Sequence, residues 1–97
     1  MINLQPATRI NPMELQQSFK LSPNPFNNQT TLYLNQSIHN GSITISNTFG
    51  QVVQRIENIN NQRIIIERGN LNRGLYVMCL SENNKVIAQT KLFITDD

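Results

Sequence analysis

The sequence predicts an all-β fold, a seven-stranded antiparallel β-sandwich of the immunoglobulin-like type. First, short segments with alternating apolar and polar residues recur along the chain, and turn-forming residues separate them. Second, no segment carries the long helical period that connections between parallel strands need. Third, residues 71–78 set a glycine at a corner and Tyr76 at the start of a strand. In β-sandwiches, a tyrosine at this position holds the start of a strand in place, because its ring packs inside and its hydroxyl bonds to a backbone group near the corner.

The alternation predicts seven strands. They are expected at residues 19–21, 30–34, 43–46, 52–57, 63–67, 75–80 and 86–94. The residues expected on their inward faces are Leu32, Leu34, Ile43, Ile45, Ile64, Ile66, Tyr76, Met78, Leu80, Val86, Ala88, Thr90, Leu92 and Ile94. Ile65 falls on the other face of its strand, so that face either exposes one isoleucine or is partly covered.

Five side chains are the strongest candidates for the core: Ile45, Ile66, Tyr76, Met78 and Leu92. Burying a side chain of this size contributes roughly 1.5–3 kcal/mol, and truncating it to alanine costs about 2–5 kcal/mol. The 97 residues make one domain with one modest core. Each of these truncations is therefore expected to remove a large share of the stability.

Turn-forming residues mark the ends of the strands. Pro23-Asn24-Pro25 ends the first strand, because two prolines fix φ and asparagine tolerates turn geometry. Asn40-Gly41 signals a tight turn, Gly50 starts a hairpin, and Asn83-Asn84 turns the chain before the last strand. Gly50 and Gly74 are expected as turn glycines and not as phosphate-binding ones. The last strand is expected at a sheet edge, with unpaired backbone groups that accept a partner strand.

Residues 1–17 lack the alternation and are expected to form a mobile linker or the remnant of a tag, so that 18–97 make up the domain. The first residues are neither basic nor followed by an apolar stretch, as a signal peptide would be. If the chain is exported, we expect the signal peptide on a larger parent protein of which this chain is a fragment. No apolar run is long enough to span a membrane.

The chain is polar but weakly charged. It contains 15 Asn and 9 Gln, whereas charged residues make up 14% and the formal net charge is +2. Nucleic-acid binding needs clustered Lys and Arg that neutralise phosphates. The basic residues are scattered along this sequence, so no nucleic-acid partner is expected.

Catalysis and metal binding need converging side chains, and the sequence supplies no such set. His39 is the only histidine and sits beside a turn, and Cys79 is the only cysteine and alternates away from Tyr76. A zinc site needs three or four ligands, and a nucleophilic cysteine needs a base beside it. The six acidic residues form no pair spaced for acid–base work. We therefore expect no enzyme, no metal, no cofactor and no small-molecule substrate.

Four phrases in a fixed order carry a family resemblance. They are Pro23-Asn24-Pro25, Ile43-x-Ile45 leading to Phe49-Gly50-Gln51-Val52-Val53, Leu71-x-x-Gly74-Leu75-Tyr76, and Thr90-Lys91-Leu92-Phe93-Ile94. Through them, residues 21–94 resemble the type A C-terminal sorting domain of proteins exported by the type IX secretion system of Bacteroidetes. Arg68 and Cys79 depart from the family pattern, and both are expected at surface positions that tolerate change.

The resemblance implies a non-catalytic export signal. Such a domain ends a folded cargo protein, is recognised by the outer-membrane export machinery and is usually removed by a surface sortase, so that the cargo is secreted or held at the cell surface. The motif residues are Pro23, Asn24, Pro25, Gly50, Leu71, Gly74, Tyr76 and Lys91. Lys91 is expected as a polar contact, whereas Leu71, Gly74 and Tyr76 are expected to determine the fold.

The alternative is an accessory carbohydrate-binding or spacer sandwich of a secreted enzyme, similar to a fibronectin type III domain. Sugar-binding platforms usually present exposed aromatic faces. This chain has no tryptophan, and Tyr33 is the one obvious outward ring. The sorting signal is therefore the favoured interpretation.

Overall fold

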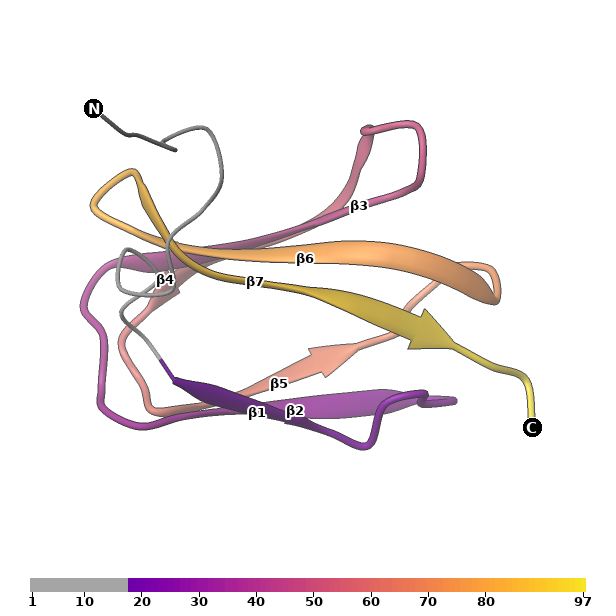
Figure 1. Ribbon diagram of the computed structural model, residues 1–97, viewed down its shortest axis with the longest axis horizontal. Coiled ribbons are helices and arrows are strands. Elements are labelled where there is room, and N and C mark those ends of the chain that lie inside the picture. The colour runs from indigo at the N-terminus through magenta and orange to yellow at the C-terminus, as the bar shows by residue number, and fades with distance from the viewer. Residues whose placement is uncertain (1–17) are drawn as a thin grey trace, which may run out of the picture.

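A computed structural model describes residues 18–97 as seven antiparallel strands in two sheets. The strands are β1 Phe19–Ser22, β2 Gln29–Leu34, β3 Gly41–Ser46, β4 Val52–Ile59, β5 Arg63–Glu67, β6 Gly74–Glu82 and β7 Lys85–Ile94. One sheet has the order β1-β2-β5 and the other the order β4-β3-β6-β7. The predicted all-β sandwich is confirmed (Figure 1). The linker expected at residues 1–17 lies outside the described residues.

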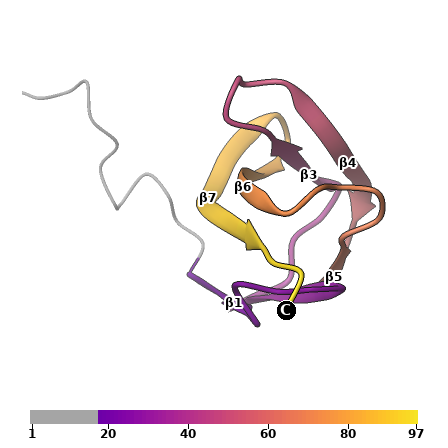
Figure 2. The ribbon, with the colours of Figure 1, turned by 90° about the vertical axis from the view of Figure 1, so that its right-hand side faces the viewer.

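The two sheets face each other across one apolar core, with the four-stranded sheet above the three-stranded sheet in Figure 2. Alternation places the apolar side chains of both sheets between the layers. The five strongest core candidates are confirmed: Ile45, Ile66, Met78 and Leu92 are fully buried, and Tyr76 is 8% exposed. The remaining buried apolar residues are Phe26, Leu32, Leu34, Ile38, Ile43, Ile59, Ile64, Leu80, Ile87, Ala88 and Ile94.

The start of β7 differs from the predicted alternation. Val86 was expected to point inward, but it is 41% exposed, and its neighbour Ile87 is buried instead. The reason is a register shift: Leu80 pairs with Ala88, whereas Ser81 pairs with Val86, so Ile87 is an extra residue on its strand. An irregularity of this kind moves a side chain to the other face, and no alternation rule anticipates it. Thr90, also expected inward, is half-buried.

The outer face of the three-stranded sheet exposes one isoleucine. Ile65 pairs with Thr31 and is 52% exposed, whereas Ile64 and Ile66 on either side of it are buried. Of the two outcomes expected for this residue, exposure is therefore the one observed.

The chain crosses from one sheet to the other between β2 and β3, and this crossing explains why a glycine follows Asn40. Ile38 is buried within the crossing. A Cβ atom at Gly41 would collide with Ile38 Cδ1. Asn40 adopts φ of +55°, and its N–H donates to Asn60 Oδ1 at 2.9 Å. The predicted turn signal therefore marks a sheet-to-sheet corner, where glycine is needed for close approach.

Candidate recognition surface

Four segments that are far apart in sequence meet at one end of the sandwich. They are the β1–β2 turn, the β3–β4 hairpin, the β5–β6 corner and the last residues of β7, all at the right-hand end in Figure 1. All eight motif residues predicted from the sequence lie in these segments or at their edges. We call this end of the domain the motif end.

The Pro23-Asn24-Pro25 turn lies against the edge of β7. The Asn24 amide donates to Lys91 O at 3.2 Å, and its Oδ1 accepts from Phe93 N at 2.9 Å. Phe26 continues the contact, because Phe26 N donates to Phe93 O at 3.0 Å and Thr95 N donates to Phe26 O at 2.9 Å. Phe26 and Ile94 thereby form a parallel bridge. The edge of β7 was expected to be free, but its second half is occupied by this turn.

The shape of the turn is fixed from its inner side. Both peptide bonds that precede its prolines, Ser22-Pro23 and Asn24-Pro25, are cis. The fully buried Thr30 donates its hydroxyl to Pro23 O at 2.5 Å. The turn is therefore tied both to β2 and to β7, and it presents the exposed Pro23, Asn24 and Pro25 in one arrangement.

The corner before β6 has the tyrosine arrangement that the sequence predicts. Tyr76 is buried, and its hydroxyl donates to Asn72 O at 2.7 Å. Gly74 has φ of +147°, a conformation that residues with a Cβ rarely adopt. Leu71 is half-buried and packs against the core cluster. The predicted hydrogen bond of Tyr76 is therefore observed, whereas the fold-determining role expected for the three residues stays a prediction.

Arg68 connects three segments of the motif end. Its Nε donates to Leu71 O at 2.8 Å, and one terminal nitrogen donates to Asn27 O and to Thr95 O at 3.2 Å each. The other terminal nitrogen pairs with Asp96 Oδ1 at 2.7 Å. The side chain is 19% exposed. Arg68 was expected at a surface position that tolerates change. The surface placement is wrong, because the side chain is half-buried and its planar fork satisfies carbonyls of the turn, the corner and the C-terminal segment.

No local signal in the sequence pointed to this role of Arg68. A lone arginine between a strand and a corner has no pattern of its own, and its partners lie 3, 27, 28 and 41 residues away in the chain. Asn27 was missed for the same reason: its amide donates to Asp97 O at 2.6 Å, 70 residues away. Only the folded arrangement brings these groups together.

Lys91 lies on the outer face of the four-stranded sheet. It pairs with Val77 across the β6–β7 ladder and is exposed, and it forms no ion pair within residues 18–97. Its carbonyl holds Asn24, while its side chain is left for solvent. Lys91 therefore binds the proline turn through its carbonyl oxygen and exposes its ammonium group to solvent.

The sequence phrases that resemble the sorting domain thus come together in one seven-stranded sandwich, and a comparison with family models agrees with the resemblance. A family model described as "Secretion system C-terminal sorting domain" matches residues 20–95. The chain belongs to this family. It carries a sorting signal of type IX secretion, and the family implies export across the outer membrane to the cell surface or beyond. No curated protein matches the chain.

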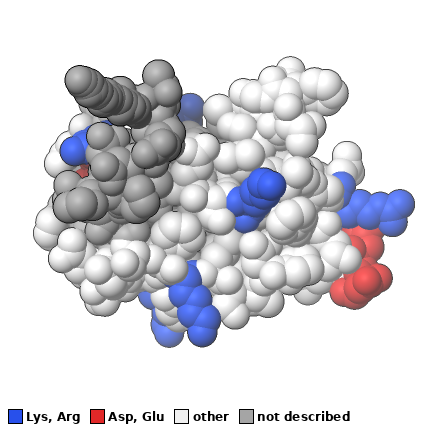
Figure 3. Space-filling view, in the orientation of Figure 1, with Lys and Arg blue, Asp and Glu red and all other residues white. Residues whose placement is uncertain are grey.

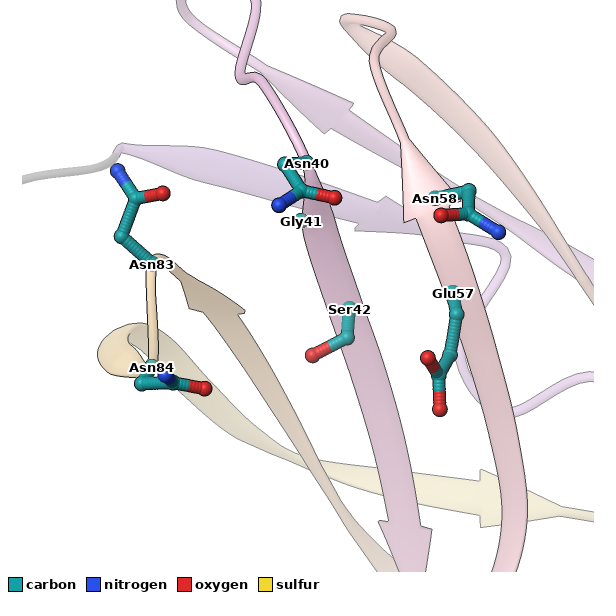
Figure 4. A pocket seen from close by; sticks show the side chains of 7 residues that line it. All are labelled: Asn40, Gly41, Ser42, Glu57, Asn58, Asn83 and Asn84. Atoms are coloured by element: carbon teal, nitrogen blue, oxygen red, sulfur yellow. The ribbon is translucent and has the colours of Figure 1, made fainter.

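The opposite end of the sorting domain holds a polar pocket of about 330 Å³. Figure 4 shows Asn83 and Asn84 of the β6–β7 turn facing the start of β3, with β4 on its other side. Its lining residues are Asn40, Gly41, Ser42, Glu57, Asn58, Asn83 and Asn84. No aromatic ring lines it, so the pocket gives no support to the carbohydrate-binding alternative.

The remaining candidate groups are isolated. His39 is exposed, and its backbone N–H donates to Glu82 at 2.8 Å. Cys79 is half-buried between Thr44 and Gln89 of the neighbouring strands, and burial raises the pKa of its thiol. Within residues 18–97, no three His, Cys, Asp or Glu side chains are placed to hold a metal ion. The same part of the chain contains no helix that could cross a membrane.

Proposed function

We propose that the motif end is the part of the sorting domain that the export machinery recognises. The observation that carries this proposal is the contact of Asn24 with the backbone of Lys91 and Phe93. This contact makes the proline turn and the last strand one preorganised surface, and preorganisation lowers the entropic cost of binding. Lys91 adds an exposed cation that no residue within 18–97 neutralises by an ion pair.

The proposal extends to the fate of the cargo. The domain directs a folded cargo protein on its N-terminal side through the type IX machinery, and a surface sortase then removes the domain. The domain itself is non-catalytic. The family to which the chain belongs supports this assignment.

The test is surface delivery of a reporter. The 97-residue chain is fused to the C-terminus of a fluorescent protein that carries a periplasmic signal, in a bacterium with type IX secretion. Truncating β7 is not informative, because Leu92 and Ile94 are buried and their loss would unfold the domain. Lys91→Ala removes only an exposed side chain and is the better probe. Lys85→Ala, at the other end of the same strand, is the matched control.

We expect the fusion to reach the cell surface and the unfused reporter to stay in the periplasm. Lys91→Ala should lower delivery with an unchanged melting temperature, whereas Lys85→Ala should match the wild type. A fusion retained in the periplasm would refute the export function. Equal delivery of the two lysine variants would remove Lys91 from the recognised surface.

A further inference from the structure

The β3–β4 hairpin displays an aromatic ring to solvent. Phe49, at the tip, is 87% exposed, the highest value among the large apolar residues of 18–97. The hairpin rises from the four-stranded sheet on the side away from the three-stranded sheet, which both views of the ribbon show (Figures 1 and 2). The core therefore makes no use of this ring.

The backbone of the hairpin is held by Asn47 and not by Phe49. Asn47 Oδ1 accepts from Phe49 N at 2.9 Å and from Gln51 N at 3.0 Å. The Asn47 backbone bonds to Gln51 O at 2.9 Å and to Gly50 N at 3.0 Å, and Gly50 takes the left-handed φ of +85° that closes the turn. The tip is thus ordered before any partner arrives, with Phe49 already presented.

Strand register brings further apolar side chains to the same face. Val52 pairs with Ser46, and Ser46 pairs with Val77 on the other side, so these three residues form a row across the sheet. Leu75 and Phe93 pair in the next row. We call Phe49, Val52, Leu75, Val77 and Phe93 the hairpin-end patch. Val52, Leu75 and Phe93 are 49%, 37% and 43% exposed.

The outer face of the three-stranded sheet has no comparable cluster. Tyr33 pairs with Lys20 on one side and Arg63 on the other, and Ile65 pairs with Thr31. Its exposed apolar residues are therefore set among polar and charged ones. Contiguous apolar surface in a soluble domain marks an interaction site, whereas single exposed side chains do not.

The charges beside the hairpin-end patch favour an acidic partner. Lys91 pairs with Val77 and forms no ion pair within 18–97, whereas Arg55 has Glu57 at 3.7 Å. Charged side chains are sparse over this view of the domain, and the surface at the hairpin is uncharged (Figure 3). A single unpaired cation gives little attraction to anionic lipid. A protein with an apolar pocket and a carboxylate fits the patch better.

We propose that the hairpin-end patch docks a protein of the export machinery, which encloses the Phe49 ring in an apolar pocket and sets a carboxylate opposite Lys91. This inference rests on the proposed export function, since it names the surface through which the machinery would hold the domain. Aromatic side chains that enter a partner's pocket are typical binding hot spots.

The experiment uses the same reporter fusion with three substitutions. Phe49→Ser removes the ring, Phe49→Leu keeps an apolar side chain, and Ile65→Ser removes an exposed apolar residue from the opposite sheet as the matched control. Because Phe49 and Ile65 are both exposed, all three variants should unfold at the wild-type temperature. Phe49→Ser should lower surface delivery on the order of tenfold or more, while Phe49→Leu keeps most of it and Ile65→Ser all of it.

The outcomes separate the two proposals. If the wild-type fusion is not delivered, the export function fails. If the wild type is delivered and Phe49→Ser is delivered equally well, only the docking inference is overturned. Two further measurements can overturn the docking inference. If the chain floats with phosphatidylglycerol vesicles and Phe49→Ser abolishes this flotation, the patch binds lipid. A wild-type dimer in sedimentation that Phe49→Ser dissociates would assign it to a second copy of the chain.

Discussion

Asn24 accepts a hydrogen bond from the backbone N–H of Phe93 at 2.9 Å, although 69 residues separate the two along the chain. Its amide nitrogen donates to Lys91 O at the same time, so one side chain takes the place of a strand residue at the edge of β7. An unpaired edge invites pairing with other chains. The contact therefore closes part of this edge and ties the first turn of the domain to its last strand.

Asn24→Ala should destabilise the domain by about 1–2 kcal/mol, because two hydrogen bonds are lost and each contributes roughly 0.5–1.5 kcal/mol. Urea unfolding followed by circular dichroism measures the change. Asn70→Ala is the control, since Asn70 is exposed and its side chain makes no hydrogen bond within 18–97. A loss of stability no larger than that of the control would mean that solvent replaces the Asn24 contacts without cost.

Tyr76→Phe keeps the buried ring and removes only the hydroxyl that donates to Asn72 O. We expect a loss of about 0.5–1.5 kcal/mol, with the far-ultraviolet spectrum unchanged. Tyr33→Phe, which alters a 41% exposed ring, should change little. Equal free energies of unfolding for the two variants would show that the corner is held by the ring alone.

Substitutions at Gly74 separate the cost of an unfavourable backbone conformation from the cost of steric crowding. Its φ is +147°, and a Cβ atom there would meet no atom within 4 Å. Gly74→Ala and Gly74→Val should therefore cost similar amounts, on the order of 1–3 kcal/mol, because the cost comes from the backbone. Gly41→Ala should also destabilise the domain, but for a different reason, because its Cβ would collide with Ile38. A much larger cost for valine than for alanine at position 74 would point to steric crowding instead.

The sequence predicted most of the fold because strands and their faces are set by local alternation. Leu32, Ile43 and Met78 lie where the period of two places them, and the Tyr76 hydroxyl reaches its carbonyl as the corner motif predicts. The alternation failed at Val86, where an extra residue shifts the register.

The arrangement of the motif end was less predictable than the strands. The hydrogen bonds of the Asn24 and Arg68 side chains join segments that are dozens of residues apart, and neither composition nor local spacing predicts such partners. The sequence could nominate Asn24 and Lys91 as separate motif residues. Only the fold shows that the side chain of one binds the backbone of the other.

Cys79 provides a pH-dependent test of its burial. Burial raises the pKa of its thiol, so less thiolate is present at a given pH than in an unfolded chain. Alkylation by iodoacetamide should therefore be slower in the folded domain than in urea, and the folded-state rate should rise only at higher pH. The folded state binds the thiol proton more tightly than the unfolded state. The protonated thiol therefore stabilises the folded state fully below the unfolded pKa of about 8.5, and this stabilisation is lost as the pH rises further. Identical pH profiles in the folded and unfolded chain would contradict the burial.

Arg68 gives the sharpest test of how the motif end is held together. Arg68→Ala leaves the carbonyls of Asn27, Leu71 and Thr95 without their donor, and Asp96 keeps only its longer ion pair with Arg73, at 3.7 Å, within residues 18–97. Hydrogen bonds from a charged group contribute about 1.5–3 kcal/mol, so we expect a destabilisation of that order. Arg68→Lys should recover little, because an ammonium group cannot match the planar fork that contacts three segments.

Arg63→Ala is the matched control for this position, since Arg63 is exposed and makes no side-chain hydrogen bond or ion pair within the described part of the chain. Amide hydrogen exchange gives the second readout. In Arg68→Ala, the N–H groups of Leu71 and Thr95 should exchange faster, while those of β3 keep their protection, because the loss is confined to one end of the sandwich. If protection fell evenly over both sheets, Arg68 would instead be supporting the whole core.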